Sequence, residues 1–77
     1  MKVEVRLYAT LRKYGPVHEG PFMMDLIQGD RLARLMELLG MPPDVEKVIL
    51  VNGRPGEPNS ILNEGDLVVL FPPVAGG

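Results

Sequence analysis

The sequence predicts a single α+β domain, in which a mixed sheet of four to five strands carries one main helix on one face. Three patterns predict this class: an alternating segment at the start of the chain, a single segment with a helical apolar stripe, and two continuous apolar runs near the end. A chain of 77 residues suits one domain with a small core. Any chemistry is therefore expected at the surface, at an end, or in a site shared with a partner.

The first strand is predicted over residues 2–8. Val3, Val5 and Leu7 alternate there with polar neighbours. Such a period of two is typical of a strand with one buried face. The strand is therefore expected to contribute one side to the core and one side to the surface.

A short helical turn and a second strand are expected next. Residues 9–14 lack alternation and predict one helical turn, which Gly15-Pro16 stops. Residues 22–27 read as a second strand, because apolar side chains recur there at every second position.

The only segment with a clear helical stripe follows Gly29. Asp30 is the expected N-cap, because its carboxylate can accept bonds from the first free amides. Gly40 is the expected left-handed terminator. The apolar side chains at helical spacing are Leu32, Leu35, Met36 and Leu39. One such stripe is enough to cover one face of one sheet.

The two apolar runs predict the central strands. Residues 48–51 are followed by Asn52-Gly53, the dipeptide favoured in a type I′ hairpin turn. A short edge strand is expected near Arg54, because prolines follow it. Residues 67–71 are again fully apolar. We expect both runs to be buried strands, the last one covered on both faces or along its whole length and lying beside the first strand.

Composition excludes several classes of function. The net charge is −2 with dispersed cations, which argues against a nucleic-acid partner. There is no cysteine, so disulfides, thiol nucleophiles and thiolate metal sites are excluded. No apolar run is long enough for a signal peptide or a membrane span, so no membrane partner and a cytoplasmic location are expected.

Few side chains are candidates for chemistry. Glu64 and Asp66 lie in a predicted turn, where solvated acids are the usual finding. His18 is the only histidine, so no metal site and no bound cofactor are expected. Tyr8 and Phe71 are either packing residues or part of a partner-binding patch. Arg12 belongs to a solvated turn or to a docking site.

The last residues offer a different functional group. Phe71-Pro72-Pro73 is expected to be extended, and Val74, Ala75, Gly76 and Gly77 follow it. A carboxylate on Gly77 is inert until a leaving group such as AMP is attached. Glycines lack Cβ atoms and can thread a narrow channel in an enzyme. At about 3.3 Å per residue, residues 71–77 could reach roughly 20 Å.

These residues resemble a known family. The ending Phe71-Pro72-Pro73-Val74-Ala75-Gly76-Gly77, the preceding Glu64-Gly65-Asp66, the start over residues 3–12 and the middle Val51-Asn52-Gly53 are similar to MoaD-type sulfur carriers of the MoaD/ThiS family, the small subunits of molybdopterin synthase. The resemblance covers nearly the whole chain. The Pro-rich connection over residues 56–60 departs from the family.

The resemblance implies a ubiquitin-like β-grasp domain over residues 1–71 and a flexible C-terminal tail over residues 72–77. It implies that a ubiquitin-activating-type adenylyltransferase uses ATP to adenylate Gly77, which then becomes a thiocarboxylate. The sulfur would serve dithiolene formation in molybdopterin, in the large synthase subunit. Tyr8, Arg12, Phe71, Pro72 and Pro73 would contact partners, and the chain would contribute no catalytic side chain. Sulfur transfer for thiamine-thiazole or tRNA thiolation, and protein modification, stay open.

Overall fold

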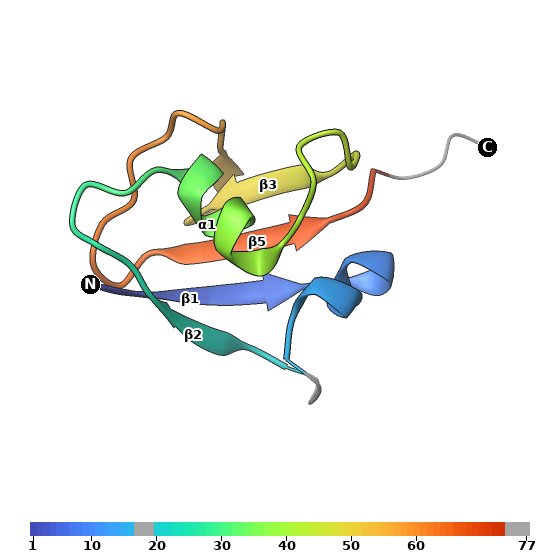
Figure 1. The fold of residues 1–77 in the computed structure, drawn as a ribbon, viewed down its shortest axis with the longest axis horizontal. Coiled ribbons are helices and arrows are strands. Elements are labelled where there is room, and N and C mark those ends of the chain that lie inside the picture. The colour runs from blue at the N-terminus through green and yellow to red at the C-terminus, as the bar shows by residue number, and fades with distance from the viewer. Residues whose placement is uncertain (17–19, 74–77) are drawn as a thin grey trace.

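The computed structural model describes residues 1–16 and 20–73. In chain order its elements are β1 (Lys2–Leu7), the 3-10 helix η1 (Ala9–Tyr14), β2 (Phe22–Asp25), α1 (Leu32–Leu39), β3 (Val48–Val51), β4 (Arg54–Pro55) and β5 (Leu67–Phe71). The strands form one sheet in the order β2-β1-β5-β3-β4 (Figure 1). Since β5 runs parallel to β1 and antiparallel to β3, the sheet is mixed, and the last strand lies beside the first as predicted.

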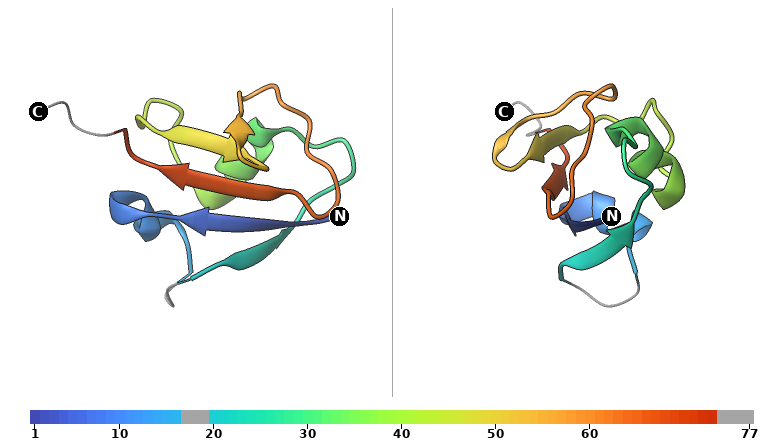
Figure 2. Two further views of the ribbon diagram at one scale, coloured as in Figure 1. Left: turned by 180° about the vertical axis from the view of Figure 1, so that it is seen from behind. Right: turned by 90° about the vertical axis from the view of Figure 1, so that its left-hand side faces the viewer.

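The core lies between this sheet and α1. Figure 2 shows the helix packed on one side of the sheet, as the single apolar stripe predicts. Val3 and Val5 of β1 are fully buried, and so are Val68 and Leu70 of β5. From the helix, the buried side chains are Leu32, Leu35 and Met36.

Two predicted boundaries shift. The helical turn over residues 9–14 is confirmed as η1. The second strand ends at Asp25 rather than at residue 27, and Ile27 is 75% exposed. The chain turns away there through Gly29, whose φ of 92° suits glycine.

The predicted N-cap at Asp30 is wrong. The N-cap position of α1 is Arg31, and no side chain caps it. The Asp30 carboxylate turns back and accepts a hydrogen bond from the Ile27 N–H (2.9 Å). Asp30 therefore stabilises the turn before α1 and does not cap the helix.

Backbone carbonyls from a distant loop take the place of the side-chain cap. Leu32 N–H donates to the Ser60 carbonyl (2.9 Å), and Ala33 N–H donates to the Pro58 carbonyl (3.0 Å). These partners satisfy amides that have no acceptor within the helix. The Pro-rich loop over residues 56–60 thus supports the start of α1.

Both predicted left-handed turns are present. Gly40 ends α1 with φ 74° and ψ 20°. The positive φ values at Asn52 (52°) and Gly53 (82°) are those of a type I′ turn between β3 and β4. β4 lies at the edge of the sheet, as the prolines predict.

Asp66 is not the solvated turn acid that the sequence suggested. It is 8% exposed and accepts hydrogen bonds from Asn52 Nδ2 (2.9 Å) and Asn63 N–H (2.8 Å). The Asn52 Oδ1 in turn accepts a bond from Leu67 N–H (2.9 Å). This cluster ties the β3–β4 turn to the start of β5.

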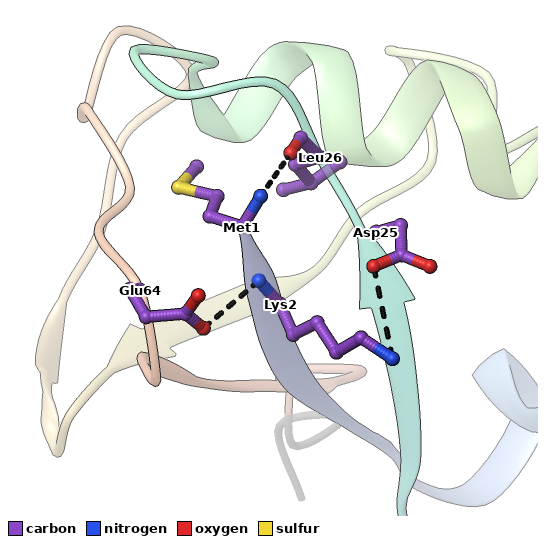
Figure 3. A network of polar contacts seen from close by, with 5 residues as sticks. All are labelled: Met1, Lys2, Asp25, Leu26 and Glu64. Atoms are coloured by element: carbon purple, nitrogen blue, oxygen red, sulfur yellow. Dashed lines mark hydrogen bonds and ion pairs between the residues drawn. The ribbon is translucent and has the colours of Figure 1, made fainter.

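Glu64 also has a structural contact, at the same end of the molecule. Its carboxylate accepts a hydrogen bond from the Lys2 N–H (2.9 Å), as Figure 3 shows. The Met1 ammonium donates to the Leu26 carbonyl (2.7 Å) beside it. The two acidic residues singled out in the sequence therefore hold the start of the sheet together.

Candidate functional site

The predicted tail leaves the sheet at the end of its central strand. Phe71 is half-buried and pairs with Val48 of β3. On the other side of β5, the Leu70 carbonyl accepts a hydrogen bond from Tyr8 N–H (3.1 Å). Pro72 is half-buried and Pro73 is exposed. We call Phe71, Pro72 and Pro73 the tail root, which starts between the ends of β1 and β3.

The remaining tail residues of the prediction are Val74, Ala75, Gly76 and Gly77. They lie outside the described residues. Their passage into a partner and the chemistry of the Gly77 carboxylate stay predictions.

An apolar surface spreads over the sheet face that points away from α1. Along β5, Val68 and Leu70 are buried, while the alternate side chains are only half-buried. The register places half-buried residues of β3 next to them. We call this surface the open face; its members are Val48, Leu50, Leu67, Val69 and Phe71.

The open face corrects the prediction of two fully buried strands. In β3 only Ile49 is buried, and β5 is covered fully on one side alone. The physical reason is that the one α-helix among the described residues lies on a single face of the sheet (Figure 2). An apolar run beside a single helix signals an uncovered apolar face, and this signal could have identified the open face in the sequence.

A polar row borders the open face along β1. Arg6 Nε donates to Glu4 Oε2 at 2.7 Å, and Tyr8 lies two positions after Arg6 in the chain. The pKa of Arg6 is raised above its ordinary value, mainly through this hydrogen bond and the charge of Glu4, with a smaller contribution from a hydrogen bond with Tyr8. The Arg6 guanidinium is therefore held against Glu4 in this row. Sequence reasoning missed Glu4 and Arg6, because alternating charges on a strand are common on ordinary surfaces.

Tyr8 and Arg12 line the same hollow. The hollow measures about 360 Å³ and is also lined by Arg6 and Pro21. Tyr8 is 43% exposed, and Arg12 is exposed on η1. The structure thus brings these two predicted contact residues together, and the backbone bond from Tyr8 to Leu70 places them beside the strand that leads to the tail root. Their role in binding a partner stays a prediction.

Side-chain chemistry finds little support in the part of the chain that the structure describes. No group of three or more His, Cys, Asp or Glu side chains could hold a metal ion there, and His18 lies outside these residues. Within residues 1–16 and 20–73, no helix has the length and hydropathy needed to cross a membrane. The distinctive features are the open face and the adjoining tail root.

Comparisons with known proteins agree with this architecture. SAMP1 from Haloferax volcanii is 23% identical, with a TM-score of 0.77 and full coverage of both chains. A putative subunit 1 of molybdopterin converting factor from Pyrococcus furiosus is 28% identical, with a TM-score of 0.76 and coverage of 95% and 98%. A chain from the complex of subunits 1 and 2 of molybdopterin-converting factor from Helicobacter pylori is 29% identical, with a TM-score of 0.65 and full coverage of both chains. A comparison with curated proteins found no match.

The predicted ubiquitin-like β-grasp fold is confirmed by these neighbours and by the mixed five-stranded sheet. The model of the ThiS family matches residues 5–77, which include the second half of β1, η1, the whole open face and the tail root. The match covers far more than half of the sequence. The chain belongs to the ThiS family and has the ubiquitin-like β-grasp fold.

Proposed function

We propose that this chain is a sulfur carrier for molybdopterin biosynthesis. In this proposal an adenylyltransferase of the ubiquitin-activating type prepares the Gly77 carboxylate, and the large subunit of molybdopterin synthase receives the sulfur. The dithiolene built with that sulfur binds molybdenum or tungsten.

Two steps load the carrier. A carboxylate oxygen of Gly77 attacks the α-phosphorus of ATP, and pyrophosphate leaves, which gives an acyl adenylate. Sulfide then attacks the acyl carbon and displaces AMP, so a thiocarboxylate forms. Both steps need groups that bind ATP and stabilise phosphoryl charge. We assign those groups to the activating enzyme.

The observation that supports the proposal most is the position of the tail root beside the open face. Phe71 belongs to both surfaces, because it is the last residue of β5 and pairs with Val48. A partner that covers the open face would therefore meet the tail root at the same edge. Such a partner can bind the folded domain outside its active site while the tail reaches inward.

The molybdopterin assignment is supported by two relatives. The chains from Pyrococcus furiosus and Helicobacter pylori are 28% and 29% identical, and both are described as parts of molybdopterin converting factor. The second comes from a complex with another subunit of that factor. A large acceptor subunit is therefore the partner that we propose for the open face.

Intact-mass spectrometry of the protein isolated from its own cells tests the proposal. The expected result is a species heavier by the exchange of one oxygen for sulfur, located by fragmentation at Gly77. Its absence from cells with active molybdenum or tungsten enzymes would contradict the carrier function.

Capture with the intact tail separates the acceptor pathways. Recovery of the large synthase subunit supports the molybdopterin assignment. Recovery of an enzyme of thiazole synthesis or tRNA thiolation instead would keep the carrier chemistry and replace its destination. Isopeptide remnants of Gly77 on target lysines would identify a protein modifier.

A further inference from the structure

Ala9 has an unusual backbone conformation. Its φ is +53°, in the left-handed region, and it immediately follows Tyr8 at the start of η1. This region is disfavoured for residues with a Cβ atom, and alanine has no side-chain hydrogen bond to compensate. The conformation must therefore be imposed by the surrounding structure.

Asn52 is the other non-glycine residue with a positive φ in the part of the chain that the structure describes, and it provides a contrast. It occupies a two-residue hairpin turn, where asparagine is favoured. Its side chain is also bonded to Asp66 and Leu67. The turn chemistry explains Asn52 completely, whereas local chemistry does not explain Ala9.

The contacts on either side of Ala9 show what its conformation achieves. Tyr8 N–H donates to the Leu70 carbonyl (3.1 Å), and the Tyr8 carbonyl accepts a bond from Leu11 N–H (3.1 Å). Leu11 is 3% exposed in the core, whereas Tyr8 is 43% exposed. The turn at Ala9 thus sends Leu11 inward and leaves the aromatic ring of Tyr8 on the surface.

The ring of Tyr8 stands at a defined place on that surface. It borders the hollow that Arg6 and Arg12 also line. The backbone N–H of Tyr8 donates a hydrogen bond to the carbonyl of Leu70, the residue directly before the tail root. Aromatic rings held in one orientation are frequent anchors at protein interfaces, because little freedom is lost when they bind.

We propose that Ala9 is a positioning residue, whose left-handed backbone fixes the orientation in which Tyr8 meets the activating enzyme. The inference rests on the proposed function. The Cβ atom of alanine leaves only a small well at positive φ, whereas glycine also has access to broad regions that other residues cannot enter. Ala9→Gly therefore keeps the turn possible and loosens the orientation of Tyr8.

The test compares Ala9→Gly with Asn52→Gly in two measurements. The first is the rate of pyrophosphate exchange with ATP, catalysed by the adenylating enzyme purified from the same cells, as a function of carrier concentration. The second is NMR relaxation of the Tyr8 ring in the free protein. Asn52 lies in the turn that follows Val51. Val51 pairs with Val68 near the start of β5, so this turn lies at the end of the strand away from the tail root.

For Ala9→Gly we expect the KM for the carrier to rise about three- to tenfold with kcat unchanged, because Tyr8 must be ordered on binding. The melting temperature should not fall, since relief of the left-handed strain offsets the greater freedom of glycine in the unfolded chain. The Tyr8 ring should become more mobile. Asn52→Gly should lower the melting temperature and leave both KM and the ring unchanged.

An unchanged KM together with an unchanged Tyr8 ring in Ala9→Gly would overturn the inference, and so would an equal rise in KM in Asn52→Gly. Absence of exchange with the unaltered protein would instead overturn the proposed function. The relaxation of the Tyr8 ring would then still decide whether Ala9 positions it.

Discussion

The two faces of the sheet differ in how completely they are covered. On the face under α1, Val3, Val5, Val68 and Leu70 are fully buried. On the open face, alternate residues of the same strand β5 keep part of their surface in solvent. Neighbouring residues of one strand therefore lie in different surroundings. One face supplies the hydrophobic stabilisation of the fold, and the other leaves apolar area in solvent beside the tail root.

Leu70 and Phe71 test this difference most strongly, because they are adjacent in β5 and face opposite sides. Leu70→Ala should lower the free energy of unfolding by about 2–5 kcal/mol, since it leaves a cavity at a fully buried position. Phe71→Ala should cost less stability and weaken binding of the large subunit by at least about 2 kcal/mol, as loss of an aromatic anchor does. Denaturant unfolding and calorimetric titration measure the two effects. If the larger stability loss occurred at Phe71, the assignment of the faces would be wrong.

A milder pair of substitutions sharpens the same comparison. Threonine in place of valine keeps the branched shape and adds a hydroxyl group. Val68→Thr buries that hydroxyl and should cost about 1–3 kcal/mol of unfolding free energy. Val69→Thr places it on the open face and should change stability by less than about 0.5 kcal/mol. Equal midpoints of urea unfolding for the two variants would contradict the account.

The cluster at the other end of β5 supports the fold alone. Asp66→Ala removes the acceptor for Asn52 Nδ2 and for Asn63 N–H, and should lower the free energy of unfolding by about 1–3 kcal/mol. Because this cluster lies away from the tail root, affinity for the activating enzyme should not change at temperatures where the variant is folded. A loss of affinity without unfolding would show that this end also contacts the partner.

The smallest effect is expected at an exposed ion pair on α1. Arg34 Nη1 lies 3.2 Å from Glu37 Oε2, with both side chains more than half exposed. Arg34→Ala should change the melting temperature only slightly, because exposed pairs of this kind contribute about 0.3–0.5 kcal/mol. A large drop would mean that the polar side of α1 also carries stability.

Most of the fold could be predicted from the sequence, because local signals decide it. Alternation marks β1, Gly40 ends α1, and Asn52-Gly53 forms the β3–β4 turn. The start of α1 could not be predicted, since its amides bond to carbonyls of Pro58 and Ser60 from a distant loop. Contacts between segments far apart in the chain leave no local pattern.

The candidate site was predictable only in part. The resemblance of the sequence to a known family predicts contact roles for Tyr8, Arg12, Phe71, Pro72 and Pro73, and the structure gathers Tyr8 and Arg12 around one hollow. The predictions from the sequence do not include the open face, although two apolar runs beside a single helical segment leave one apolar face of the sheet uncovered. The left-handed φ of Ala9 has no sequence signal either, since alanine is not a residue that favours it.

The central claim is that the folded domain serves to present the Gly77 carboxylate. Its most direct test is pyrophosphate exchange with the activating enzyme, comparing the unaltered protein with a variant that lacks Gly76 and Gly77. The account predicts that the variant melts at the same temperature, still binds the enzyme, and supports no exchange. Exchange at the unaltered rate in the shortened variant would contradict it.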